Sequence, residues 1–116
     1  MRRVVVTGMG LVTPLGCGKN ANWENLIHGK SGAVKISKFN PSEFKCKVAC
    51  EVPTDPNEEN SFIPENWIEK KELKKIDEFI KFTLVAAEEA FSQSKLKFLD
   101  DPVSYRSGCI IGSGMG

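Results

Sequence analysis

The sequence predicts an α/β fold in which short buried strands alternate with amphipathic helices. Two apolar runs, Val4–Val6 and Cys109–Ile111, each lead into a glycine-rich turn, and a long stretch between them has helical periodicity. The order strand, helix, strand, long helix, strand is typical of a mixed, mainly parallel sheet covered by helices. No internal repeat competes with this interpretation.

The first strand is expected over residues 3–7, because the Val4–Val6 run is β-branched. Gly8 and Gly10 follow it directly. Glycine at this point indicates that the chain turns tightly or that another group approaches the backbone closely. A turn is then expected around Thr13–Gly16.

The first helix is expected to begin with Asn20 as its N-cap and to end at Gly29 and Gly32. Its apolar residues are Trp23, Leu26 and Ile27. Residues 44–52 alternate lysines with apolar residues, which predicts a half-exposed strand that Pro53 ends.

The acidic, proline-containing residues 54–66 predict a surface loop, with a short helical turn at Pro64–Ile68. A long amphipathic helix is expected next, over Glu72–Ser94. Its apolar positions are Leu73, Ile76, Phe79, Ile80, Leu84, Ala87 and Phe91. Asp100–Pro102 is expected to interrupt the regular secondary structure, and Arg106–Gly112 is expected to be the last strand.

Composition indicates one small domain of an ordinary cytoplasmic protein. The 116 residues are 41% hydrophobic and 27% charged, with a net charge of +1. No apolar run approaches the roughly 18 residues of a membrane span, and the run after Arg3 is too short for a signal peptide. Charge is uneven, because residues 1–50 carry eight Lys and Arg against two acids, whereas Glu51–Glu65 carries acids alone. We expect neither a nucleic acid nor a membrane as a partner.

Cysteine and histidine do not form a recognisable site. None of the four cysteines has the spacing of a metal site, and His28 is the only histidine. Two nucleotide-binding motifs are incomplete. Thr13 stands where a dinucleotide-binding turn after Gly8 and Gly10 needs its third glycine, and Asn20 stands where a phosphate loop needs Ser or Thr. We therefore expect neither a metal site nor a nucleotide-binding site.

Four segments together resemble a known family. Residues 3–16, 23–32, 71–80 and 111–116 resemble, in order and spacing, the N-terminal part of the β-ketoacyl-[acyl-carrier-protein] synthases of the thiolase-like superfamily, most closely the type II (3-oxoacyl-ACP synthase II) enzymes. Residues 52–63 do not align with the sequences of this family. Family members are several times longer, so the resemblance implies that residues 1–116 are an incomplete N-terminal part of a synthase domain. Catalytic segments are expected beyond residue 116.

The resemblance implies an acyltransferase of fatty-acid synthesis, active as a homodimer, that condenses an acyl group with malonyl-acyl carrier protein. Such enzymes use a cysteine, two histidines and a lysine, and the resemblance implies no metal and no organic cofactor beyond the pantetheine of the carrier protein. None of their motifs is present here, so no catalytic residue is expected in this chain, and the chain alone is expected to be inactive. A thiol without a base and an oxyanion hole is not a condensing site.

The resemblance does assign binding residues. Gly114 and Met115 match a turn at the wall of the acyl pocket, although Met115 also suits a plain core position. Four lysines match the basic stretch that meets the acidic carrier protein, although a solvated helix face explains them equally well. They are Lys70, Lys71, Lys74 and Lys75. A non-catalytic remnant or carrier-binding fragment is the alternative function.

Overall fold

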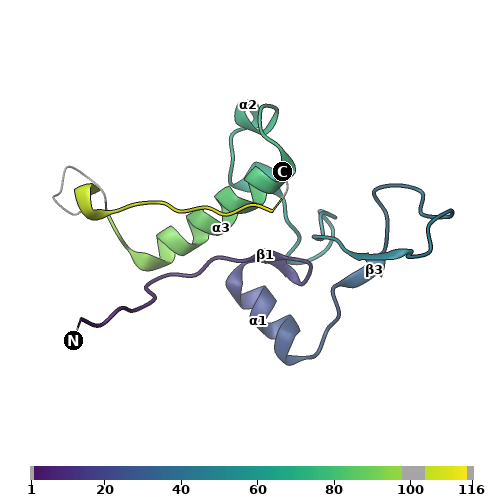
Figure 1. Cartoon of the computed structure of the whole chain (residues 1–116), viewed down its shortest axis with the longest axis horizontal. Helices are drawn as coiled ribbons and strands as arrows, with labels where there is room; N and C mark the ends of the chain where they lie inside the picture. The colour runs from purple at the N-terminus through teal and green to yellow at the C-terminus, as the bar shows by residue number, and fades with distance from the viewer. Residues whose placement is uncertain (1, 98–103, 115–116) are drawn as a thin grey trace.

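The structure, a computed structural model, describes residues 2–97 and 104–114. Its elements are β1 (Val12–Thr13), β2 (Gly16–Cys17), α1 (Lys19–Ile27), β3 (Ala33–Lys35), β4 (Val48–Cys50), the 3-10 turn η1 (Pro64–Asn66), α2 (Lys70–Leu73), α3 (Glu78–Ser94) and the 3-10 turn η2 (Ser104–Arg106). Figure 1 shows α3 in the middle, with α1, α2 and the β3 region projecting in different directions. The Cα radius of gyration is 17.1 Å, against about 13 Å for a compact chain of this length. The chain is therefore open.

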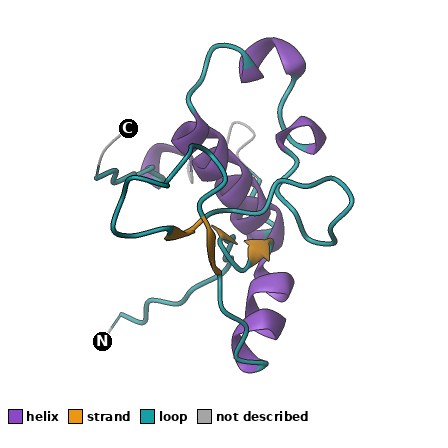
Figure 2. Ribbon diagram, turned by 90° about the vertical axis from the view of Figure 1, so that its right-hand side faces the viewer, coloured by secondary structure: helices purple, strands orange, loops and turns teal. Residues whose placement is uncertain are grey.

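The described strands form two separate antiparallel pairs. β1 pairs with β2 across the predicted turn, with Val12 opposite Cys17, and β3 pairs with β4, with Val34 opposite Ala49. The strand expected over residues 44–52 is thus shorter than predicted, because only Val48–Cys50 has a partner strand. Figure 2 shows how little of the chain is strand.

Neither outer segment of the predicted sheet is a strand, so these two predictions were wrong. Residues 3–7 have no strand assignment, and Arg106 belongs to η2 while residues 107–112 follow without one. Val4 is 97% exposed and Ile110 is 100% exposed. A β-branched run becomes a strand only when a neighbouring strand accepts its backbone hydrogen bonds and its side chains are covered.

Helix α1 starts earlier than expected. Gly18, rather than Asn20, is its N-cap and contributes no side-chain cap. The predicted end is confirmed, because His28 is the C-cap and Gly29 follows with φ of +66°. That left-handed conformation is one that glycine adopts without a steric penalty.

The long helix is interrupted near its expected start. Glu78–Ser94 forms α3, whereas Lys70–Leu73 forms the separate α2. Asp77 has φ of −73° and ψ of 164°, an extended conformation that the helix cannot continue through. No helix in the described part of the chain is long and apolar enough to span a membrane.

The core is small and centred on α3. Val85 is 1% exposed, Phe62 is 2% exposed, and Ala21 is also buried. The Phe62 and Phe82 rings lie edge to face, with centroids 4.9 Å apart. The predicted loop over residues 54–66 therefore supplies a core residue, and its helical turn is confirmed at Pro64–Asn66. So few buried apolar residues can provide only marginal stability.

Candidate functional site

The glycine-containing N-terminal segment lies directly against α3. A Cβ atom at Gly8 would collide with the backbone carbonyl of Ala90, and one at Gly10 would collide with that of Ala86. The close backbone approach predicted from these glycines is thus confirmed. Any larger residue at either position would force the segment away from the helix.

Two polar side chains of α3 hold this segment. The Met9 amide donates to Oε1 of Gln93 at 2.9 Å, and the Leu11 amide donates to Oε2 of Glu89 at 3.0 Å. The other oxygen of Glu89 accepts a hydrogen bond from the Lys19 amide at 2.7 Å. Lys19 is the first residue of α1, so Glu89 satisfies an amide at a helix start that Gly18 leaves without a side-chain cap.

A second polar cluster fixes the β1–β2 turn on α1. The buried Asn22 amide group donates to the carbonyl oxygens of Gly16 at 2.9 Å and Gly18 at 2.8 Å. The Thr13 hydroxyl donates to Oδ1 of Asn22, and Asn25 donates to the Leu15 carbonyl at 2.6 Å. These bonds orient the side chains on both sides of the turn.

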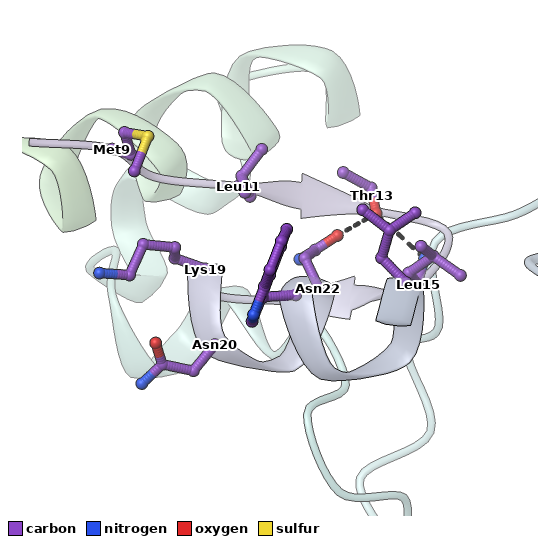
Figure 3. A pocket seen from close by; sticks show the side chains of 9 residues that line it. Met9, Leu11, Thr13, Leu15, Lys19, Asn20 and Asn22 are labelled. Atoms are coloured by element: carbon purple, nitrogen blue, oxygen red, sulfur yellow. Dashed lines mark hydrogen bonds between the residues drawn. The ribbon is translucent and has the colours of Figure 1, made fainter. Parts of the chain in front are cut away.

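Between the N-terminal segment and α1 lies an apolar cavity of about 660 Å³ (Figure 3). Met9 and Leu11 reach it from the N-terminal segment, and Lys19 and Asn20 stand at the start of α1. The other lining residues are Thr13, Leu15, Asn22, Trp23 and Leu26. This arrangement can hold an apolar group, but its lining contains no carboxylate and no imidazole, so it has no acid–base pair for chemistry.

The thiol nearest this cluster is not activated. Burial, and then the charge of Glu89, raises the pKa of Cys17 above its usual value, which favours the protonated thiol. His28 lies at the opposite end of α1, where its Nδ1 contacts the Glu24 carbonyl at 2.7 Å. Among the described residues, no group of three or more His, Cys, Asp or Glu side chains is placed to hold a metal ion.

The four lysines, which we call the lysine segment, lie on α2 and the turn after it rather than on α3. All four are exposed, and Figure 1 shows α2 projecting from the body of the chain. Lys75 forms an ion pair with Glu72 at 2.7 Å. Lys70, Lys71 and Lys74 form no ion pair with any residue that the structure describes, and their side chains are exposed to solvent.

The predicted acyl-contact turn is only partly described. Gly114 is exposed, and a Cβ added there would meet no atom within 4 Å. Met115 lies outside the described residues. The preceding segment does approach α3, because Cys109, Thr7 and Phe91 of α3 all line an open hollow of about 650 Å³.

Sequence reasoning did not identify Glu89, Gln93 or Asn22. Helical periodicity separates polar from apolar faces but does not show which polar side chain meets a distant backbone amide. The available signal for these polar residues was the pair Gly8 and Gly10. A backbone that approaches a helix closely needs polar side chains on that helix to accept hydrogen bonds from its amides.

Comparison with known proteins places these features in a family. The sequence profile of the family described as "Beta-ketoacyl synthase, N-terminal domain" matches residues 1–116. The chain is 38% identical over 116 residues to 3-oxoacyl-[acyl-carrier-protein] synthase 2 of Rhizobium meliloti and 36% identical over 115 residues to that of Coxiella burnetii. It covers 28% and 26% of those proteins, so it spans about a quarter of the length of these relatives.

A solved structure gives the same result. The ishigamide ketosynthase/chain length factor superposes with a TM-score of 0.69 at 32% sequence identity, over 83% of this chain and 22% of that one. The similarity confirms the predicted α/β fold class, a part of the thiolase-like fold, although the described strands here are short.

Proposed function

The chain belongs to the family of β-ketoacyl synthase N-terminal domains, and from this we propose that it is the N-terminal part of a condensing enzyme of fatty-acid synthesis. The complete enzyme would join an acyl group, held as a thioester on an enzyme cysteine, to malonyl-acyl carrier protein with loss of carbon dioxide. The relatives' name, 3-oxoacyl-[acyl-carrier-protein] synthase 2, supports this reaction. The match of the profile along the whole chain is the observation that carries the proposal.

Residues 1–116 would contribute structure and binding surfaces rather than catalysis. The raised pKa of Cys17 and the remote position of His28 support this division, because a condensing nucleophile needs a reactive thiolate or a nearby base. We propose that the catalytic segments belong to the remainder of a longer, homodimeric synthase. The 28% coverage of the Rhizobium meliloti protein is consistent with that.

Two surfaces are assigned roles in this proposal. Gly114 and Met115 would contact the growing acyl chain, and the lysine segment would attract the acidic carrier protein. The exposure of all four lysines supports an encounter role. Such a surface acts mainly on the rate of association.

A direct assay tests the catalytic division. Purified chain is mixed with acyl- and malonyl-acyl carrier protein, and 3-oxoacyl product is measured. We expect no product. Turnover that persists after removal of any contaminating synthase would contradict the proposal.

Charge reversal tests the carrier surface. Lys74→Glu combined with Lys75→Glu should slow association with carrier protein about tenfold at low salt and flatten its salt dependence. Lys97→Glu with Arg2→Glu, which changes net charge equally, is the matched control. An unchanged association rate would leave the lysine segment as a solvated surface.

The alternative is a non-catalytic fragment that binds carrier protein or a full-length subunit. Its supporting observations are the exposure of the lysine segment and the raised pKa of the Cys17 thiol. Sequencing the gene beyond the codon for Gly116 separates the two. A downstream Thr-Ala-Cys motif with two histidine motifs indicates the enzyme, and a stop codon indicates the fragment.

A further inference from the structure

A second basic surface lies on the β3–β4 pair and its connecting loop, residues 33–51, which we call the basic hairpin. Among the described residues, β3 and β4 pair only with each other. Most side chains of the basic hairpin are exposed, and Pro41 is its buried exception. Its surface is therefore available to a partner along its length.

The basic hairpin combines positive charge with exposed apolar groups. Its charged residues are Lys35, Lys38, Lys45 and Lys47 against Glu43 and Glu51. The Phe39 and Phe44 rings lie edge to face with centroids 5.6 Å apart, yet they remain 53% and 60% exposed. An aromatic centre surrounded by charge is the arrangement of a protein-binding surface.

The basic hairpin is joined to α3 by one exposed ion pair and is held together internally by hydrogen bonds. Lys38 forms an ion pair with Glu78 at 2.7 Å. Glu51 accepts hydrogen bonds from the Ser37 hydroxyl at 2.6 Å and the Ser37 amide at 3.1 Å. A surface ordered in advance loses less conformational entropy when a partner binds.

The same ion pair joins the basic hairpin to the start of α3, which follows the lysine segment in the sequence. Glu78 is the first residue of α3 and follows Lys75 by three residues. The carboxylates of Glu78 and Glu51 are engaged by partners within the chain. Lys35, Lys45 and Lys47 form no ion pair within residues 2–97 and 104–114, so their charges remain available to an acidic partner.

We propose that the basic hairpin is a second contact for the acidic acyl carrier protein, with the lysines directing the encounter and the Phe39–Phe44 pair supplying apolar contact. The inference rests on the proposed function and extends its carrier surface. We favour the carrier protein over an anionic membrane because the name of the relatives, 3-oxoacyl-[acyl-carrier-protein] synthase 2, includes that partner, and because the lysines complement an acidic protein surface.

The test measures binding of the 116-residue chain to phosphopantetheine-loaded acyl carrier protein. Lys35→Glu, Lys45→Glu and Lys47→Glu together should slow association about tenfold at low salt. The matched control Arg2→Glu, Lys30→Glu and Lys97→Glu makes the same change in net charge and should stay within about twofold of the unmodified chain. Phe39→Ser with Phe44→Ser should instead speed dissociation about tenfold.

The Lys74→Glu/Lys75→Glu variant separates this inference from the proposed function. If that variant is impaired while both hairpin variants bind like the unmodified chain, the inference is overturned and the lysine segment stands. If neither surface affects binding, both fail. Binding of the basic hairpin to phosphatidylglycerol vesicles, with carrier binding insensitive to the hairpin variants, would also overturn the inference in favour of a membrane contact.

Discussion

The segment packed at the centre of the molecule and the two ends of the chain are all rich in apolar residues, but their structures differ. At the centre, the Gly8–Thr13 segment lies against α3 and continues into the β1–β2 pair beside α1. At the ends, residues 2–7 and 107–114, which we call the end segments, are exposed and have no strand assignment. Figure 1 shows the N-terminal end segment extending beyond the end of α3, and neither end segment joins a sheet.

The difference teaches that apolar character alone does not make a segment ordered. The segment also needs another part of the protein to cover its side chains and pair with its backbone. The amides of Met9 and Leu11 have acceptors on α3. Val4 and Ile110 are almost completely exposed. Strands with apolar residues on both faces need helices or further strands over both faces, and the described chain does not provide them.

The largest expected effect is at the glycine contact. Gly10→Val should lower the free energy of unfolding by about 3 kcal/mol, because its side chain would overlap the Ala86 carbonyl in a helix that cannot shift locally. The control Gly112→Val lies in an end segment, where an added Cβ meets no atom within 4 Å. It should change stability by less than about 0.5 kcal/mol. Urea titration of both variants checks the difference, and equal losses would remove the distinction between centre and ends.

Core truncation should have the next largest effect. Val85→Ala removes two methyl groups from a site that is 1% exposed and should cost about 2 kcal/mol of unfolding free energy. Val4→Ala removes the same groups from a site that is 97% exposed, so its midpoint in urea should match that of the unmodified chain. A large loss in Val4→Ala would show that the N-terminal segment is packed in solution.

Removing the carboxylate that joins the N-terminal segment to α1 should have a smaller effect. Glu89→Ala leaves the amides of Leu11 and Lys19 without this acceptor and should cost about 1 kcal/mol. Glu89→Gln keeps one oxygen acceptor and should lose less unfolding free energy than Glu89→Ala. Thermal unfolding of the pair checks the order, and equal stability of Glu89→Ala and the unmodified chain would mean that the contact contributes nothing.

The smallest effect is expected in the basic hairpin. Hydrogen bonds from the side chain and then the backbone of Ser37 hold the pKa of Glu51 below its usual value. A lowered folded-state pKa contributes stability above the ordinary carboxyl pKa, and that contribution is lost as pH falls through the folded-state value. Ser37→Ala should move the pKa of Glu51 upward. Carboxyl NMR titration measures this, and an unmoved pKa would show that the hydroxyl contact is absent in solution.

The sequence predicted local features better than the pairing of distant segments. The end of α1 at Gly29, the turn after Thr13 and the close approach at Gly10 all follow from the conformational properties of the residues themselves. The outer strands were predicted wrongly, because β-propensity describes how well a residue fits into a sheet but does not provide the neighbouring strands that a sheet requires.

The candidate site shows the same limit. The exposure of the lysine segment agrees with its charge, but its position on the separate α2 depends on the break at Asp77, which helical periodicity does not reveal. Glu89 was missed because its partners, the amides of Leu11 and Lys19, are 70 or more residues away in sequence.

Amide hydrogen exchange on chain shown by size-exclusion chromatography to be monomeric tests the central claim most directly. The claim is that the centre is ordered while the end segments lack the partners that would complete a sheet. We predict slow exchange around Val85 and fast exchange at Val4–Val6 and Ile110–Ile111, with self-association at higher concentration through the exposed apolar segments. A monodisperse monomer in which Val4–Val6 is protected as strongly as Val85 would contradict the account, because it would show that these residues close their own core.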